Sequence, residues 1–462
     1  MTSPDVIVIG AGCAGLSAAC ALAERGARVL VPEARAQLGG RATAFLDRES
    51  GEYVDNGQHV LMGCYHETRA YLRRVGAGEA VQFQPRLAFT CVDLDGRVTR
   101  LACPPWRPPL HLAGGLLRWQ ALTWRDRWAA TRMLAPLKLA RRAVTQGTAL
   151  PVLDGETVAQ WLGRHRQTPT LVAQLWEPLA LAALNQPITL AEAAPFVRVL
   201  GQIFSDDPFD AALGVPARPL HQVFGEPARA YLEAHGGQVK LDAPSRVVLA
   251  GDRVGYVDTR GTSVRAETVV VAVPWFGLAN VLRGHEHGPL RDLVAAESTR
   301  ASSSIVSVNL WLERGALPAP FVGLPERTFH WMFDKRWAFG ESASHFTLVA
   351  SGADHVLRRS NQELADLALA EATTALPGLT RAQVQRVRVV REPNATFSLA
   401  SGQPPRPSLR TPVRGLLLAG DWTDTGLPAT IEGAVVSGHR AAAAATAPET
   451  RHAIARRTCD LP

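Results

Sequence analysis

Three glycines near the N-terminus have the spacing that a phosphate-binding turn requires. Gly10 permits a tight turn after an apolar strand, Gly12 lets the backbone approach a pyrophosphate, and Gly15 allows a helix to pack closely on that strand. The helix that follows opens at Cys13 and Ala14, where unpaired N–H groups and the helix dipole favour an anion. The turn therefore predicts a site for a dinucleotide pyrophosphate.

An acidic residue and a second glycine turn extend this pattern. Glu33 ends the second predicted strand, where a carboxylate can accept hydrogen bonds from ribose hydroxyls. Gly39 and Gly40 let the backbone come close to a ligand, and Arg41 can pair with a phosphate. The residues of this part of the chain that we expect to bind the cofactor are Gly10, Gly12, Cys13, Ala14, Gly15, Glu33, Ala34, Arg35, Gly39, Gly40 and Arg41.

A third motif lies near the C-terminus, where a strand leads into a loop and then a helix. Gly420 and Asp421 begin the loop, and the Asp421 carboxylate can accept a hydrogen bond from a ribityl hydroxyl or contact the phosphates. The helix begins near Thr430, Ile431 and Glu432. Its first N–H groups can face the pyrimidine edge of a flavin and stabilise the negative charge of the reduced ring. The three motifs together predict FAD.

The hydrophobic pattern predicts an α/β fold, α+β overall, with a Rossmann-type domain. Strand, turn, helix and strand follow one another over residues 4–33. Residues 104–200 have a mainly helical pattern. Segments that alternate apolar and polar residues predict an antiparallel sheet with one covered face, at residues 305–312, 328–333 and 345–351.

We expect two interleaved domains. An FAD-binding domain is formed by residues 1–88, 225–290 and 405–447. A substrate-binding domain of an antiparallel sheet and helices is inserted into it, at residues 89–224 and 291–404. We expect residues 448–462 to form a mobile tail.

The composition predicts a cytoplasmic globular protein. The 462 residues are 47% hydrophobic and 20% charged, which excludes an intrinsically disordered chain. No run of about 18 apolar residues predicts a membrane-spanning helix, and no signal peptide is predicted. The six scattered cysteines match neither a disulfide framework nor a metal site, so we expect a reduced compartment and no bound metal.

The net charge of +7 is concentrated in residues 104–144, which hold eight basic residues, one acidic residue and four tryptophans. A basic, tryptophan-rich stretch favours an anionic membrane surface over nucleic acid. We expect this segment to dock on the cytoplasmic face of a membrane. A helical cap with solvated arginines is the alternative, because the apolar residues do not follow one helical face and Pro136 interrupts the run.

The chain resembles the superfamily of flavin amine oxidases and carotenoid desaturases over most of its length. Its N-terminal fingerprint and Gly39-Gly40-Arg41, which NAD dehydrogenases do not need, are shared across that superfamily. Narrower motifs resemble the bacterial hydroxysqualene dehydroxylases: DNGQH at 55–59, NATF at 394–397, PPRP at 404–407, AGDWT at 419–423 and GLPATIEGA at 426–434.

The resemblance implies non-covalent FAD and the reduction of hydroxysqualene to squalene in hopanoid synthesis. It also implies that the segment around Val247 holds the adenine and that the DNGQH segment lies near the flavin. Asp55 or His59 could then be the catalytic acid, or both could hold a loop and the cofactor. Asp424 and Glu432 are comparable candidates, although we expect Glu432 to cap or orient its helix.

The implied reaction is the reductive removal of an allylic hydroxyl. Protonation of the hydroxyl lets water leave, and reduced flavin N5 delivers hydride to the resonance-stabilised allylic cation. The reaction requires an electron donor, which the sequence leaves open. One alternative is carotenoid-type desaturation or isomerisation, in which the flavin takes the hydride instead.

Two further alternatives are amine oxidation and non-catalytic lipid binding. Amine oxidation usually places tyrosines beside the flavin, and the position of all five tyrosines before residue 257 argues against it. The intact flavin motifs oppose a lipid-binding escort. Some amine oxidases also place a lysine near flavin N5, but we expect Lys335 to lie at the surface.

Overall fold

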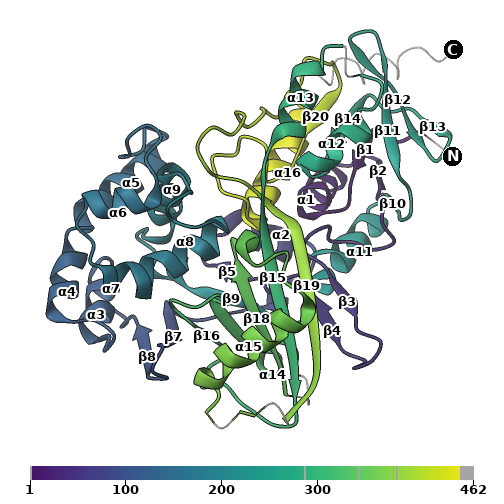
Figure 1. Ribbon diagram of the computed structural model, residues 1–462. Coiled ribbons are helices and arrows are strands. Elements are labelled where there is room, and N and C mark those ends of the chain that lie inside the picture. The colour runs from purple at the N-terminus through teal and green to yellow at the C-terminus, as the bar shows by residue number, and fades with distance from the viewer. Residues whose placement is uncertain (1–2, 286–287, 341–343, 378, 381–382, 448–462) are drawn as a thin grey trace, which may run out of the picture.

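The computed structural model describes residues 3–285, 288–340, 344–377, 379–380 and 383–447 (Figure 1). The predicted mobile tail, residues 448–462, lies outside the described residues. Among the described residues, no helix is long and apolar enough to cross a membrane. The same part of the chain holds no group of three His, Cys, Asp or Glu residues arranged to bind a metal ion.

A parallel five-stranded sheet forms the core of one end of the molecule (Figure 1). The strands lie in the order β10 (Gln238–Lys240), β2 (Val29–Pro32), β1 (Val6–Ile9), β14 (Thr268–Val271) and β20 (Leu416–Leu418). They come from three separated parts of the chain, and β1, β2, β14 and β20 are buried throughout. This sheet confirms the predicted α/β class with a Rossmann-type core.

Helices α1 (Cys13–Ala23) and α16 (Ile431–Ala445) cross closely beside this sheet. Every residue of α1 is buried. A Cβ atom at Gly438 would lie 2.2 Å from the Ala14 carbonyl oxygen, so the close crossing requires glycine there. The other elements of this end are α2 (His66–Arg74), α10 (Leu220–Phe224), α11 (Glu226–Ala234), α12 (Trp275–Val281), α13 (Arg291–Thr299), β11 (Ser245–Ala250), β12 (Arg253–Thr259) and β13 (Thr262–Val264).

A second, seven-stranded sheet occupies the lower part of the molecule (Figure 1). Its order is β19 (Val384–Phe397), β15 (Ser302–Leu312), β18 (Ser344–Ser351), β17 (Trp331–Asp334), β16 (Phe321–Gly323), β7 (Ala88–Val92) and β8 (Val98–Ala102). Neighbouring strands are antiparallel, as predicted, except β16 and β7, which pair in parallel. Helix α15 (Asn361–Ala375) packs against this sheet through Leu364, Ala368 and Ala372.

Short sheets join these two ends. One pairs β3 (Ala44–Leu46) with β4 (Tyr53–Asp55). The other holds β5 (Leu61–Met62), β9 (Leu213–Pro216) and β6 (Val81–Phe83). Helix α14 (Lys335–Phe339) follows β17 directly.

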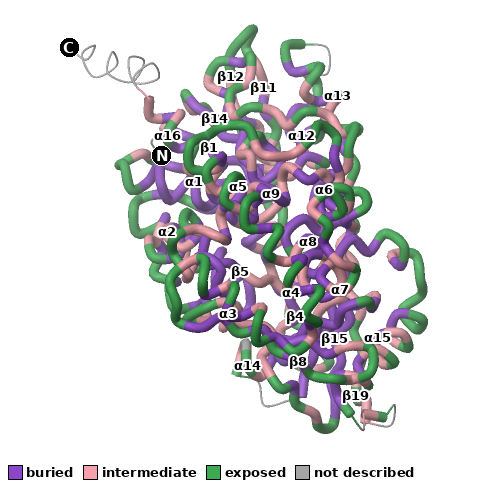
Figure 2. The backbone as a smooth tube through the Cα atoms, turned by 90° about the vertical axis from the view of Figure 1, so that its left-hand side faces the viewer, coloured by how far each residue is buried: buried purple, intermediate pink, exposed green. Residues whose placement is uncertain are grey.

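The segment predicted to be mainly helical forms a lobe on one side of the molecule (Figures 1 and 2). Its helices are α3 (Leu110–Arg118), α4 (Trp124–Thr131), α5 (Leu134–Gln146), α6 (Val158–Arg164), α7 (Pro169–Leu171), α8 (Glu177–Leu184) and α9 (Ala193–Ile203). Trp119 anchors the lobe to the seven-stranded sheet, because its ring is fully buried 5.5 Å from the Phe89 ring and its Nε1 donates to Thr99.

Candidate functional site

A cavity of about 850 Å³ lies at the N-terminal ends of α1 and α16, within the usual size range of cofactor sites, about 300–1,000 Å³. Most of the predicted cofactor-binding residues line it, although they come from distant parts of the sequence. They are Gly10, Gly12, Cys13, Ala14, Glu33, Ala34, Arg35, Gly39, Gly40, Arg41, Gly420, Asp421, Thr430 and Ile431. Gly15, Val247 and Glu432 are not in the lining.

The two glycine turns form a backbone cradle at one end of this cavity. Gly10 has a φ of +107°, and a Cβ atom at Gly15 would lie 1.9 Å from the Gly10 carbonyl oxygen. A Cβ atom at Gly40 would lie 3.1 Å from the Gly12 Cα, so the turns approach each other closely. Helix α1 has neither a side-chain cap nor an acidic residue in its first turn, which leaves its first N–H groups to bind a phosphate. The cradle fits a pyrophosphate.

Glu33 is held rigidly at the cavity wall. Its Oε2 accepts a hydrogen bond from the Ala11 N–H at 2.7 Å, and its Oε1 accepts one from the Arg35 N–H at 2.9 Å. The carboxylate is buried and lies at the end of β2. Further lone pairs of the two oxygens can accept the hydroxyls of a ribose.

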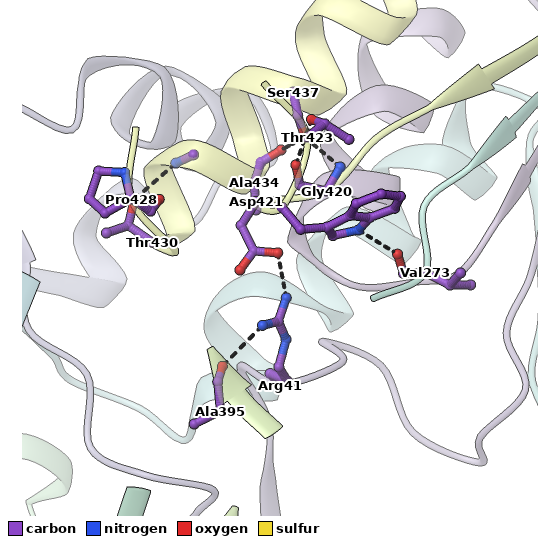
Figure 3. Close-up of polar contacts among 12 residues, drawn as sticks. Arg41, Val273, Ala395, Gly420, Asp421, Thr423, Pro428, Thr430, Ala434 and Ser437 are labelled. Atoms are coloured by element: carbon purple, nitrogen blue, oxygen red, sulfur yellow. Dashed lines mark hydrogen bonds and ion pairs between the residues drawn. The ribbon is translucent and has the colours of Figure 1, made fainter. Parts of the chain in front are cut away.

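Arg41 and Asp421 form an ion pair that also lines the cavity (Figure 3). Arg41 Nη2 lies 2.5 Å from Asp421 Oδ1, and Arg41 Nη1 donates to the Ala395 carbonyl at 3.0 Å. The guanidinium also lies over the ring of Trp275, at 5.3 Å. Arg41 therefore connects the segments that carry Asp421 and Ala395. The ion pair places one positive and one negative group at the cavity wall.

Arg406 organises the loop that carries Asp421, and sequence reasoning gave it no role. Its guanidinium donates to the carbonyls of Asp421 at 2.7 Å and Leu427 at 2.6 Å, and to that of Thr423. Burial lowers the pKa of Arg406 to about 10. The arginine lies in the PPRP motif, so its two flanking prolines were the available signal for a fixed position.

Of the four candidates for the catalytic acid, only His59 lines the cavity. Its Nδ1 lies 2.9 Å from the Gly57 carbonyl oxygen. Burial lowers the pKa of His59, and nearby Arg41 and Lys335 add to this effect, against Gly57 and Asp55, which raise it. Asp424 is exposed and outside the lining.

Asp55 is buried in an ion pair with Lys335, so the expected surface position of Lys335 is wrong. Lys335 Nζ lies 2.7 Å from Asp55 Oδ2, and the lysine side chain is 0% exposed. The same ammonium donates to Gln58 Oε1 and lies over the Phe339 ring. Asp55 also accepts the Leu220 N–H at 3.2 Å. The lysine therefore ties together two members of the DNGQH motif.

Glu432 and Val247, both predicted to bind the cofactor, lie outside the cavity lining and have roles within the fold. The Glu432 carboxylate accepts the Thr68 and Glu67 N–H groups at 2.8 and 3.0 Å, at the start of α2. It therefore orients a neighbouring helix, where we expected it to orient its own. Val247 is fully buried in β11, while its neighbour Arg246 lines the cavity.

None of the five tyrosines is among the residues that line the cavity. The tyrosine cage expected beside the flavin of an amine oxidase is therefore missing from this wall.

Comparisons with known proteins identify the family of the chain. The sequence model of the flavin containing amine oxidoreductases matches residues 13–446. A hydroxysqualene dehydroxylase of Rhodopseudomonas palustris is 32% identical over 95% of this chain and 98% of its own length, and one of Zymomonas mobilis is 27% identical over 94% and 97%.

More distant proteins share the fold. A 15-cis-phytoene desaturase of an Oncidium hybrid is 24% identical over 94% of this chain and 76% of its own length. The crystal structure of an oxidoreductase from Methanosarcina mazei has a TM-score of 0.73 at 15% identity and covers 94% of this chain, with 99% of that chain matched.

Proposed function

The chain belongs to the family of flavin-containing amine oxidoreductases and is similar to the hydroxysqualene dehydroxylases within it. We propose that it is an FAD-dependent enzyme that reduces hydroxysqualene to squalene. The observation that supports this most is His59. It places a titratable group of the DNGQH motif in the same cavity wall as the cofactor-binding turns.

We propose that FAD binds non-covalently along this cavity. The α1 N-terminus and the two glycine turns hold the pyrophosphate, and Glu33 holds the ribose of the adenosine half. Arg41 and Asp421 hold the phosphate and ribityl groups. The N-terminal end of α16, where Thr430 caps the helix and Ile431 lines the cavity, would face the pyrimidine edge. When bound and reduced, the flavin supplies the hydride.

The protein supplies the proton that lets water leave. We propose His59 as this acid, because it lines the cavity while Asp55 is held by Lys335 and Asp424 lies at the surface. The contact of Nδ1 with the Gly57 carbonyl fixes the ring and leaves Nε2 to donate to the substrate hydroxyl. His59 gives a proton to the substrate hydroxyl, the C–O bond breaks and water leaves. The resulting allylic cation accepts the hydride to form squalene.

An apolar cluster supports a long hydrocarbon as the substrate. Phe321, Phe333 and Val349 are buried in this cluster. Val60 packs against it at one side, next to His59 in the sequence, and Phe89 packs against it from β7. The other partly buried members are Leu213, Val215, Ile305 and Trp331. We propose that the isoprenoid chain extends from the reacting carbon toward this cluster.

Carotenoid-type desaturation is the second candidate, because phytoene desaturases match 94% of this chain. It uses the same cavity with the hydride transferred in the opposite direction.

Anaerobic turnover separates the two candidates. Dithionite-reduced enzyme is incubated with hydroxysqualene, and oxidised enzyme is incubated with phytoene. We expect squalene in an amount equal to the reduced flavin, and no desaturated carotenoid. Desaturation of phytoene with no action on hydroxysqualene would establish the second candidate instead.

A further inference from the structure

Helices α3, α4 and α5, together with the loop before α3, expose several large apolar side chains. Trp124 is 74% exposed, Trp128 is 69% exposed and Trp106 is 44% exposed. Four leucines of these helices are also at least half exposed, namely Leu110, Leu117, Leu134 and Leu139. Figure 1 shows α3 and α4 at the left-hand edge of the helical lobe. We call the exposed side chains of residues 106–142 the helical face.

Each of these helices has one buried side and one exposed side. Helix α4 buries Asp126 and Ala129 and exposes Trp124 and Trp128, which lie one turn apart. In α5 the buried residues are Pro136, Ala140 and Ala143. The helical run is interrupted just before Pro136, between the end of α4 at Thr131 and the start of α5 at Leu134. Pro136 itself lies in the first turn of α5, where its missing N–H has no helical acceptor. Three short helices explain why one helical period did not fit the whole segment.

The charge of the helical face is entirely positive among its exposed residues. Six of the eight basic side chains are exposed, namely Arg107, Arg118, Arg125, Arg132, Lys138 and Arg142. The single acid, Asp126, is buried in the first turn of α4, where its carboxylate accepts hydrogen bonds from the N–H and the hydroxyl of the capping residue Thr123. Arg127 is used inside the fold, since its Nη2 donates to the Trp119 carbonyl at 3.0 Å.

We propose that the helical face docks the protein on an anionic lipid bilayer. Exposed tryptophans favour the headgroup region of a bilayer, and basic side chains among them favour anionic lipid. A protein partner would need an acidic surface with pockets for two adjacent indoles, whereas a bilayer accepts both without a matched shape. The inference names a partner for the proposed function, but docking requires no turnover and so can be tested apart from it.

A series of apolar contacts links the helical lobe to the apolar cluster. Trp119, at the end of α3, contacts Phe89, and Phe89 packs against the same cluster as Val60. Apolar side chains therefore extend from beneath the docking helices to the residue beside His59.

Vesicle flotation tests the proposal. Purified FAD-loaded protein is mixed with vesicles of phosphatidylcholine containing phosphatidylglycerol, or of phosphatidylcholine alone, and centrifuged through a density gradient. We expect flotation with the anionic vesicles, weaker flotation with the neutral ones, and release at 1 M salt, where charges are screened beyond about 3 Å. Wild-type protein that stays at the bottom with anionic vesicles at low salt overturns the proposal.

Two sets of variants locate the contact. Replacing Arg118, Arg125, Arg132 and Lys138 by Gln should lower the partition coefficient by about fivefold per residue, several hundredfold in all. A matched control replaces Arg253, Arg265, Arg291 and Arg314, all exposed elsewhere, by Gln and should float like the wild type. Equal flotation of the two quadruple variants contradicts the proposal.

A second variant tests the apolar contribution without changing charge. Trp124→Ser with Trp128→Ser should weaken binding to both kinds of vesicle and reduce the blue shift of tryptophan fluorescence on binding. Unchanged binding of this variant also overturns the proposed face. Retained flavin absorbance in every variant reports that the fold is intact.

Discussion

At the residue scale, Lys335 and Asp55 form a pair whose members cannot be removed separately. Their side chains are 0% and 2% exposed. Lys335→Met leaves the Asp55 carboxylate buried without its partner, so we expect unfolding free energy to fall by about 3–5 kcal/mol. Urea unfolding of the apoprotein measures the loss. Lys335→Met with Asp55→Asn should recover most of it, and a double variant no more stable than Lys335→Met would contradict this account.

His59 should give the reaction its pH dependence. An acid must carry its proton to act, and burial lowers the pKa of His59 from the ordinary 6.5. We therefore expect kcat/KM with hydroxysqualene to rise as pH falls toward that lowered pKa and then to level off. His59→Gln should lose this rise and about 10²–10⁴-fold in rate. His355→Gln changes an exposed histidine and should keep the wild-type profile. The same rise in His59→Gln would remove His59 as the acid.

Glu33 should contribute to cofactor affinity. Hydrogen bonds from ribose hydroxyls to a charged carboxylate contribute about 1.5–3 kcal/mol each. We expect Glu33→Gln to weaken FAD binding by roughly ten- to a hundredfold, measured by flavin fluorescence quenching. Glu79→Gln, at an exposed glutamate, is the control. Equal affinities in the two variants would show that Glu33 does not hold the ribose.

Single residues were predictable where chemistry follows from local spacing. Gly10, Gly12, Glu33 and Thr430, which their motifs singled out, line one cavity. Pairs that join distant segments were not predictable, because local patterns contain no information on which loops meet. Asp55 and Lys335 are 280 residues apart, and a lone lysine carries no signal of burial.

At the scale of elements, the crossing of α1 and α16 should depend on Gly438. A Cβ atom there would lie 2.2 Å from the Ala14 carbonyl and from Ser17 Oγ. We expect Gly438→Ala to destabilise the fold by about 1–3 kcal/mol or more, because the helices must separate. Gly163→Ala, in α6 with no atom near the added methyl, should be neutral or stabilise by up to about 1 kcal/mol.

Thermal unfolding of the two glycine variants makes the comparison. A Gly438→Ala melting temperature equal to that of Gly163→Ala would show that the crossing tolerates a methyl group. Since both helices begin at the cavity, the Gly438 variant should also bind FAD less tightly.

Periodicity predicted the elements well where one face is buried. Strands β1, β2, β15, β17 and β18 and helices α1 and α16 lie where apolar spacing placed them. The pattern over residues 104–144 was harder to interpret, because the segment forms three short helices and each has its own buried side. One helical period therefore does not describe the whole segment. The parallel pairing of β16 with β7 was also beyond local pattern, since it depends on how two distant strands meet.

At the scale of the whole molecule, the account joins three regions. The parallel sheet and its helices place the cofactor-binding turns around one cavity. The DNGQH segment adds His59 to the wall, and the seven-stranded sheet contributes the apolar cluster beside it. The helical lobe is attached to that sheet through Trp119. This arrangement suits a water-insoluble alcohol that must meet a proton and a hydride away from water.

The most direct test of the central claim is a single turnover in deuterated buffer. The flavin is reduced anaerobically in deuterium oxide, so that its exchangeable N5 position carries deuterium, and hydroxysqualene is added. Mass spectrometry and NMR of the product then locate the label. Direct transfer predicts squalene with one deuterium on the former carbinol carbon. Squalene without deuterium at that carbon would contradict the account.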